Sequence, residues 1–508
     1  MINDPQKLGD RPPHRAAKKR ILLAIIAVLL ALVLWLLWPF LTSRPAYYAD
    51  IDEHFRYGTI GGESTDGIPY WLWKALPVVF EDRLPPDHLP GEGMTAFGFM
   101  QEPDHDLPIG FAKSSRQILP ALGLDVVTQN CATCHVGKLR ETPTAPVTLI
   151  STMPGHNVNL QGYIQFLTAI APDERFSAKH IMPYIAEMGA NLNPLEKLVY
   201  KFFVIPQARE QLLRERLDLA FMDRQSQYGP GRVDTFTSYK TRRFGFPVEL
   251  LPPEQLNGIA DYPSIWNQGP RAGMYLHWDG NNNNPDERNR TAALALVAPG
   301  NLNFDSLYRL QQWLNDLPAP QYPYAINQDL VAQGKPIFEA NCASCHDILN
   351  RPDKLNLETV IPIGDIQTDR GRLDSYTYDL TSNQYLLFSD ITYRGEDKRF
   401  KNYRKTNGYA SAPLDGIWLR SPYLHNGSVP TMRDLLNPPA ERPTTFYRGY
   451  DVYDQENMGF VTTVAGENSK QFFQYDTSLG GNGNGGHLYG TALSDSDKTA
   501  LIEYLKTL

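Results

Sequence analysis

Two copies of one five-residue motif constrain this chain more than any other feature of its sequence. Each copy has two cysteines three positions apart and a histidine directly after the second, as Cys131-Ala-Thr-Cys134-His135 and Cys342-Ala-Ser-Cys345-His346. The chain has four cysteines, and all of them lie in these motifs, so no thiol remains for a structural disulfide or a nucleophile. On the first turn of a helix, such thiols can add to the two vinyl groups of one haem, and the histidine becomes the proximal iron ligand. The sequence therefore predicts two covalently bound haem c groups.

Two other uses of paired cysteines fit this pattern poorly. Zinc sites built from two Cys-x-x-Cys pairs usually have those pairs about 15–20 residues apart. Here 211 positions separate Cys131 from Cys342. A redox-active dithiol needs no histidine directly after its second cysteine, and this chain has one in both copies. Haem attachment is therefore the interpretation that accounts for all six residues.

A long apolar segment near the N-terminus predicts a membrane anchor. Residues 21–40 contain no charged side chain, and at about 1.5 Å per residue a helix of this length crosses the roughly 30 Å hydrocarbon layer. Lys18, Lys19 and Arg20 precede the segment and only Arg44 follows it closely, which predicts a cytoplasmic basic tail over residues 1–20. The alternative is a cleaved signal peptide, whose apolar part is usually about 7–15 residues long. We expect an uncleaved transmembrane helix at residues 21–42, an inner-membrane anchor and catalytic domains in the periplasm.

The charge balance excludes one class of partner. The formal net charge is -8, and residues 1–44 are basic, so the rest of the chain is near -13. Binding to nucleic acid requires a basic face, and we therefore expect no nucleic-acid partner. An acidic body suits a basic or neutral redox partner, and we expect a small electron-donor protein such as a cytochrome c or a cupredoxin.

Helical patterns and prolines suggest a division into two halves. We expect a mainly α fold with long loops and two cytochrome c-type haem domains, over residues 43–325 and 326–508. Residues 333–341 and 494–508 are predicted to be the first and last helices of the second domain, with Ser494 as an N-cap. Residues 305–317 are the expected closing helix of the first domain, and prolines mark a linker near 318–327. About 170 residues between Cys131 and that helix form a large insertion, with helices expected near 157–170 and 195–221.

Several longer segments resemble one known group of proteins. Residues 412–430, with Pro422-Tyr-Leu-His425-Asn-Gly427, look like a loop of the di-haem cytochrome c peroxidase superfamily. Residues 263–270, 276–280 and 486–490 make the chain most similar to the rubber oxygenase branch, whose members are di-haem dioxygenases. The resemblance implies that O2 binds at the first haem, with His135 as proximal ligand. It implies that the second haem, with His346 as proximal ligand, is closed by two histidines and serves as an electron reservoir.

The sixth ligand of the second haem is sought among the remaining histidines and methionines. His487 is the first candidate, because it follows the glycine-rich loop 480–486, which can approach a haem closely, and its position resembles the family's distal histidine. The alternative is an ordinary surface histidine. His425 is the second candidate, although the matching histidine of the peroxidases lies near the haems without ligating iron, which favours a propionate or relay contact. Met432 and Met458 would give a His/Met haem, but either is more often a core residue.

Three further residues are candidates for the chemistry at the first haem. Trp278 resembles the inter-haem tryptophan of the rubber oxygenases, and the alternative is a buried core aromatic residue. His277 lies where those enzymes have an apolar aromatic residue. Its imidazole could act as a general acid–base in peroxide cleavage, or could ligate iron and close the site. His156 is a third candidate for the distal pocket. The resemblance also implies a calcium ion between the haems, although no acidic loop has a recognisable calcium spacing.

These observations lead to one functional hypothesis and one alternative. We expect a di-haem oxidoreductase of peroxidase or dioxygenase type, which binds O2 or H2O2 at the first haem and receives an electron from the second through Trp278. The alternative is an electron carrier in which both irons have six ligands. A carrier would not need the large insertion in the first half.

Overall fold

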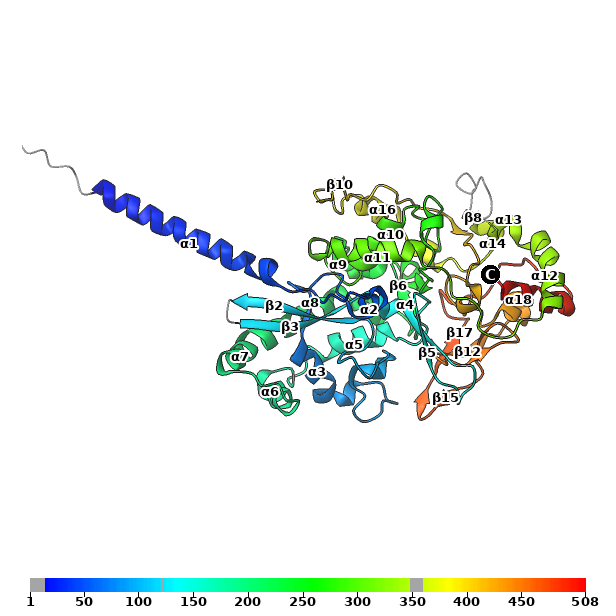
Figure 1. Ribbon diagram of the computed structural model, residues 1–508, viewed down its shortest axis with the longest axis horizontal. Coiled ribbons are helices and arrows are strands. Elements are labelled where there is room, and N and C mark those ends of the chain that lie inside the picture. Colours follow the sequence, from blue (N-terminus) through cyan, green and yellow to red (C-terminus); the bar gives the residue numbers. More distant parts are fainter. Residues whose placement is uncertain (1–13, 120–121, 348–359) are drawn as a thin grey trace, which may run out of the picture.

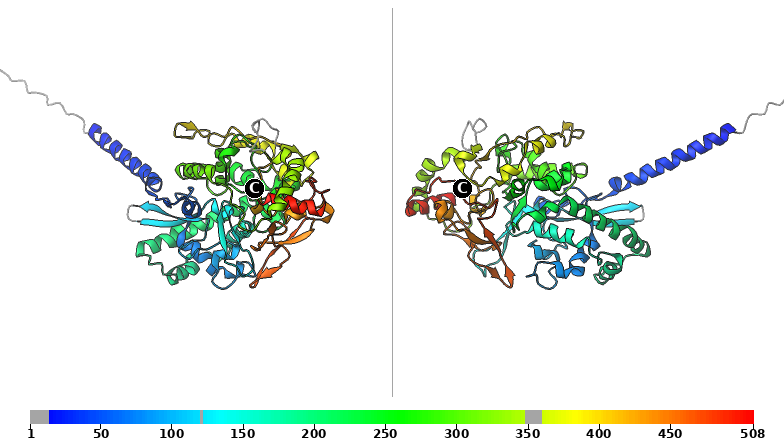
Figure 2. Two further views of the ribbon diagram at one scale, coloured as in Figure 1. Left: turned by 45° about the vertical axis from the view of Figure 1, so that its right-hand side comes forward. Right: turned by 180° about the vertical axis from the view of Figure 1, so that it is seen from behind.

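A computed structural model of the chain describes residues 14–119, 122–347 and 360–508. Helix α1 (His14–Thr42) extends away from the body in every view (Figures 1 and 2). The described part of the chain contains no helix that is both long and apolar enough to cross a membrane. The predicted transmembrane helix at 21–42, and the inner-membrane location inferred from it, are therefore wrong. Residues 1–13 of the predicted basic tail lie outside the described residues.

The first half contains a β-sheet that the mainly α prediction missed. Strands β1 (Ile68–Pro69), β2 (Phe111–Leu119) and β3 (Leu122–Gln129) form an antiparallel sheet in the order β1-β3-β2. Phe111 pairs with Gln129 and Lys113 with Val127, so that the apolar residues of β3 face the core. β-Branched residues favour this extended conformation because they pack well on a pleated surface.

Short two-stranded ladders occur throughout the described chain, and they make the mainly α prediction wrong. The pairs are β4 (Val136–Leu139) with β5 (Thr148–Ser151), β6 (Arg232–Asp234) with β7 (Ile259–Asp261), β8 (Val360–Pro362) with β11 (Gly408–Ala410), β9 (Thr392–Tyr393) with β10 (Glu396–Asp397), β12 (Thr445–Arg448) with β17 (Phe473–Asp476), β13 (Tyr453–Asp454) with β14 (Gly459–Phe460), and β15 (Gly466–Glu467) with β16 (Lys470–Gln471). All of these strands are two to four residues long, too short to give a periodic sequence signal.

The helices of the first half include the single turn that carries the first motif. They are α2 (Ile51–Tyr57), α3 (Tyr70–Val79), α4 (Ala132–His135), α5 (Leu160–Ile170), α6 (Ala178–Glu187), α7 (Pro194–Val199), α8 (Ile205–Asp218), α9 (Thr237–Phe244), α10 (Pro285–Leu294) and α11 (Phe304–Asp316). The helices expected near 157–170 and 305–317 correspond to α5 and α11. The helix expected at 195–221 is a run of α7, one turn of π-helix and α8. Asn303 caps α11, and its Oδ1 accepts a hydrogen bond from the Ser306 amide.

The second half is closed by its first and last helices, as predicted. Its helices are α12 (Gln328–Asn341), α13 (Ala343–His346), α14 (Ile363–Ile366), α15 (Gly371–Ser375), α16 (Tyr378–Gln384), α17 (Met432–Leu435) and α18 (Asp495–Leu505). α12 packs against α18, and the two lie together at one end of the molecule (Figure 1). They approach closely at Gly334, where an added Cβ atom would lie 2.0 Å from the Ala500 carbonyl oxygen. Ser494 caps α18 as expected, accepting from the Asp497 amide at 3.2 Å.

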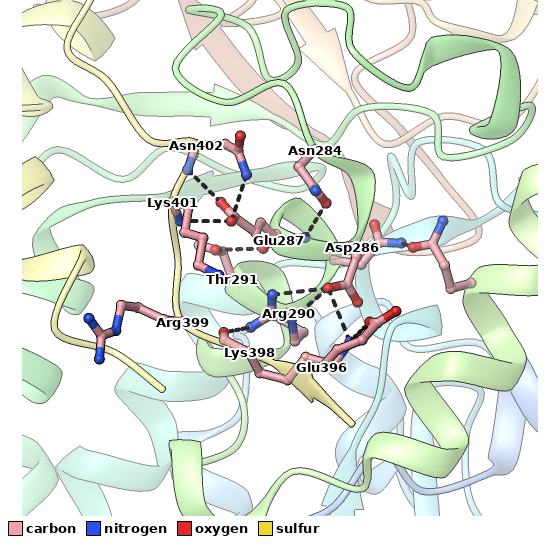
Figure 3. Close-up of polar contacts among 12 residues, drawn as sticks. Asn284, Asp286, Glu287, Arg290, Thr291, Glu396, Lys398, Arg399, Lys401 and Asn402 are labelled. Atoms are coloured by element: carbon pink, nitrogen blue, oxygen red, sulfur yellow. Dashed lines mark hydrogen bonds and ion pairs between the residues drawn. The ribbon is translucent and has the colours of Figure 1, made fainter. Parts of the chain in front are cut away.

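Contacts between the two halves are extensive. Residues 376–403 of the second half share a hydrophobic core with α2, α4 and α11 of the first, as shown by the packing of Phe388, Phe400 and Tyr403 in that core. On the outer side of the same region, residues 396–402 lie across α10 and form a cluster of polar contacts with it (Figure 3). The domain division predicted near residue 325 stays a prediction.

Candidate haem sites and the cavity between them

The first motif forms a single helical turn that is fixed by side chains on either side. Asn130 accepts a hydrogen bond from the Ala132 amide at 3.0 Å and donates to the Gly58 carbonyl at 2.8 Å. Thr133 donates from its hydroxyl to the Gly110 carbonyl at 2.9 Å. Cys131 and Cys134 are free thiols, and burial raises the pKa of Cys131 to about 11. The turn therefore presents two free thiols, as thioether formation with haem requires.

Both motif histidines are held in the state that a metal ligand needs. His135 Nδ1 lies 2.9 Å from the Pro263 carbonyl oxygen, and His346 Nδ1 lies 2.8 Å from the Ala412 carbonyl oxygen. A carbonyl accepts only from a protonated nitrogen, so each Nε2 keeps its lone pair. Burial lowers the pKa of His135 to about 4 and also lowers that of His346, so both rings are neutral at physiological pH. Orientation of a ligating histidine by a backbone carbonyl is common in metal sites.

A second imidazole faces His346. The ring centroids of His346 and His487 are 6.3 Å apart. Two metal–imidazole bonds of about 2 Å each, together with the ring radii, span about 6 Å. The pair therefore fits one iron between two histidines, and His487 Nδ1 has no hydrogen-bond partner among the described residues.

The backbone at His487 is fixed by close approach to a neighbouring loop. Gly486 has φ 72°, and a Cβ atom there would lie 2.3 Å from the Gln367 carbonyl carbon. The His487 amide donates to the Ile366 carbonyl at 2.8 Å. Arg442 donates to the carbonyls of Gly486 at 3.0 Å and of His487 at 3.3 Å. The glycine-rich loop thus allows the approach that the sequence suggested, and the role of His487 as a ligand stays a prediction.

The first motif lacks a matching imidazole. Among the described residues, His135 makes a ring contact only with Tyr262, at 6.2 Å between centroids, and with no second histidine. The two candidate sites therefore differ: two histidines face each other at the second, and a histidine faces no other at the first.

A cavity of about 270 Å³ is lined by residues of the second motif and by Pro263, whose carbonyl oxygen holds His135 of the first. Its lining is mostly apolar and includes Trp278, His277, His425, His346, His487 and Arg288. A larger cavity of about 440 Å³ lies among β3, α3, α5 and α8, and none of its described lining residues belongs to a motif. We therefore take the smaller cavity as the candidate functional site.

Trp278 lies in this cavity between segments that support both motifs. Its indole N–H donates to the Asp261 carbonyl at 3.0 Å, so that this donor is already engaged and not free for a propionate. Asp261 is two residues before Pro263, whose carbonyl holds His135. The indole also packs against a small core that contains Ile366 and Tyr409 of the second half. The short segment 261–263 therefore links the proximal histidine of the first motif to Trp278.

His277 has a strained backbone and a defined hydrogen-bond partner. Its φ of 62° lies in the left-handed region, which is costly for a residue with a side chain. Its Nδ1 lies 2.5 Å from Asn281 Oδ1, which requires a proton on Nδ1 and leaves Nε2 unprotonated. Burial lowers its pKa to about 4, with a smaller contribution from Arg372. The side chain is thus a neutral imidazole with a free Nε2, able to accept a proton or to bind a metal.

The remaining candidates take different positions. His425 also lines the cavity, stacks on Tyr409 at 4.1 Å, and its Nε2 lies 3.0 Å from the Tyr409 hydroxyl oxygen. Met432 lines the cavity, and Met458 is a core residue.

His156 is not among the residues lining the cavity and stacks on Phe460 at 4.0 Å. Within the described residues, no group of three His, Cys, Asp or Glu side chains could hold a metal ion, so calcium stays a prediction.

Sequence reasoning missed Arg288 and Tyr409. Arg288 lies in the run Asp286-Glu-Arg-Asn-Arg290, which resembles an exposed, charged helix face. In the structure its side chain is 9% exposed and lines the cavity. Tyr409 sits in a short strand and contacts His425. Neither residue carries a local sequence signal, because both contacts depend on how the two halves fold together.

Comparison with known proteins identifies one segment. Residues 408–447 match a family described as RoxA-like, cytochrome c-like. The chain is 26% identical over 565 residues to the uncharacterized protein y4iJ of Sinorhizobium fredii, covering 90% of each chain. It is 31% identical over 293 residues to the uncharacterized protein y4iM of the same organism, covering 49% of this chain and 64% of that one. The match supports the rubber oxygenase branch, while the wider peroxidase superfamily stays a prediction. Residues 408–447 are thus similar to part of a RoxA-like cytochrome c, and this similarity supports haem c as the cofactor.

Proposed function

We propose that this protein is a c-type oxidoreductase with two haems, which reacts with O2 or H2O2 at the first site and stores an electron at the second. The observation that carries this proposal is the difference between the two sites. His346 has His487 opposite it at 6.3 Å, whereas His135 has no second histidine in ring contact among the described residues. A site with one histidine keeps a coordination position for a small oxidant, and a site with two does not.

The residues of the chain fit these roles. Cys131, Cys134, Cys342 and Cys345 would attach the two haems, and His135, His346 and His487 would ligate iron. The haems supply the redox chemistry when bound. His277 offers an unprotonated Nε2, which can accept a proton from a peroxide or return it to a leaving hydroxide. Trp278 provides an aromatic ring between the segments that hold the two motifs.

Reduction of H2O2 to water is the reaction that His277 favours, because it requires a proton to move from one oxygen to the other. Oxygen insertion into an organic substrate is the outcome that the rubber oxygenase resemblance favours. His277 is polar where that branch has an apolar aromatic residue, which argues against polyisoprene as the substrate. A cytochrome c or a cupredoxin is the proposed electron donor, because the net charge after residue 44 is acidic.

One observation favours a second candidate, an electron-transfer cytochrome without a catalytic site. The free Nε2 of His277 belongs to a cavity whose lining also includes Pro263, the residue whose carbonyl oxygen holds His135. If this nitrogen ligates the first iron, both sites are closed, and the protein only carries electrons.

Spectroscopy of the purified protein separates the two candidates. We would record absorption and EPR spectra of oxidised and reduced protein, alone and with CO, O2 or H2O2. One low-spin haem beside one that is high-spin or exchanges ligands supports the oxidoreductase. Two low-spin haems that respond to no ligand in either oxidation state contradict it and support the carrier. In that case the His277→Phe variant tests whether His277 is the closing ligand, because it would restore CO binding at one haem.

A further inference from the structure

Arg288 is a buried cation in the candidate site with no partner among the described residues. It lies on α10, is 9% exposed, and lines the cavity beside His277 and Trp278. Its guanidinium makes no hydrogen bond or ion pair with any residue that the structure describes, and its Nη2 atom is fully buried without a partner. Burial lowers its pKa to about 10, so the group is still charged at physiological pH.

The helix around Arg288 is held rigidly. The neighbouring residue Glu287 accepts hydrogen bonds from the backbone amides of Lys401 at 2.8 Å and Asn402 at 3.1 Å, and from the Asn402 side chain at 2.7 Å (Figure 3). On the inner side, the Asn282 side chain donates to the same carboxylate at 3.0 Å. These contacts fix the rotation of α10 about its axis. Arg288, the next residue on α10, is thereby held where its side chain lines the cavity.

The other two arginines that line the cavity are compensated. Arg271 and Arg420 both pair with Asp415, at 2.5 and 3.1 Å. Asp261, an acidic residue in the same lining, pairs with Arg448 at 3.0 Å. Of the three arginines in the described lining, Arg271 and Arg420 thus have a counter-ion just outside it, in Asp415, and Arg288 has none among the described residues. Its charge depresses the pKa values of both His135 and His277, which places it near the first motif and the candidate base.

A buried charge without a partner is strongly unfavourable and is normally paired. We propose that Arg288 binds a carboxylate inside this cavity. The planar guanidinium can donate two parallel hydrogen bonds to the two oxygens of a carboxylate, which makes this anion a better match than a single-atom ion. The carboxylate has two possible sources. One is a propionate of a covalently attached haem, and this source rests on the proposed function. The other is an organic acid that enters the cavity, and this source is independent of the proposed function.

The test uses the purified holoprotein and the variants Arg288→Leu and Arg288→Lys. Arg399→Leu, which changes an exposed arginine of the segment facing α10, is the matched control. Haem content per chain is measured first, so that failure of the two-haem proposal is seen separately. The midpoint potential of each haem is then measured from pH 5.5 to 9. Octanoate binding is measured by calorimetry, with octanamide as the uncharged control.

Pairing with a propionate predicts a lower midpoint potential in Arg288→Leu, because a positive charge near the iron is lost, and a new pH dependence as the propionate titrates. Arg288→Lys should be intermediate. Pairing with an organic acid predicts that octanoate, but not octanamide, binds the wild type and binds Arg288→Leu at least tenfold more weakly. The proposal is overturned if Arg288→Leu matches Arg399→Leu in both potentials and in octanoate binding. If the leucine variant does not fold, the same comparison is made with Arg288→Lys.

Discussion

At the scale of single residues, His487 is the side chain that distinguishes the two sites. Its replacement by alanine removes the imidazole that faces His346 and leaves the second site with one histidine. We expect the reduced His487→Ala protein to bind two CO molecules per chain, where the wild type binds one. The measurement is a CO titration followed by absorption. His180→Ala, at an exposed position on α6, is the control and should bind one. A stoichiometry of one in His487→Ala would show that another residue is the ligand.

A second residue-scale prediction concerns pH. Burial lowers the pKa of His277 from about 6.5 to about 4, so the neutral base persists as the pH falls through 6.5 and is lost only near pH 4. The rate of reaction with H2O2 should therefore be constant from pH 8 to about 5 and should fall below that. His277→Phe should be slower by about 10²–10⁴-fold and independent of this titration. His156→Phe, which changes a histidine outside the cavity lining, should keep the wild-type profile. A wild-type rate that halves near pH 6.5 would contradict the assignment.

At the scale of elements, the crossing of α12 and α18 depends on the absence of a side chain at Gly334. Alanine usually stabilises a helix relative to glycine, but here its Cβ atom would lie 2.0 Å from the Ala500 carbonyl oxygen. We expect Gly334→Ala to lower the free energy of unfolding by about 1–3 kcal/mol, the usual effect of overpacking. Gly364→Ala is the control, because a Cβ atom there meets nothing within 4 Å. Urea denaturation measures both, and equal midpoints would show that the helices can move apart.

The elements also show which parts of the fold a sequence reveals. The helices α5, α11, α12 and α18 follow from apolar spacing and from caps such as Ser494, which are local features. The strand pairs do not, because ladders such as β4 with β5 have too few residues for an alternating pattern and depend on their partners. The expected transmembrane helix rested on hydropathy alone, and no described helix meets the requirements of a span.

At the scale of the whole molecule, the sequence predicts only those parts of the candidate site whose residues are neighbours in the sequence. The cysteines and proximal histidines are contiguous in the sequence, and the loop before His487 is marked by its glycines. The surroundings of these residues are assembled from both halves. The carbonyls that orient His135 and His346 belong to Pro263 and Ala412, 128 and 66 positions away. Contacts over such distances leave no periodic trace in a single sequence.

Glu287 gives the last prediction, because it joins the two halves beside the site. Its buried carboxylate accepts from residues 401 and 402 (Figure 3) and from the side chain of Asn282. In Glu287→Gln an NH2 group replaces one carboxylate oxygen and faces donors, so we expect a loss of about 1–3 kcal/mol in the free energy of unfolding. Glu396→Gln, which changes an exposed carboxylate paired with Lys398, should remain within about 0.5 kcal/mol of the wild type. Because Glu287 fixes α10, its variant should also shift haem potentials in the direction of Arg288→Leu. Loss of stability without that shift would show that Arg288 keeps its position independently of this contact.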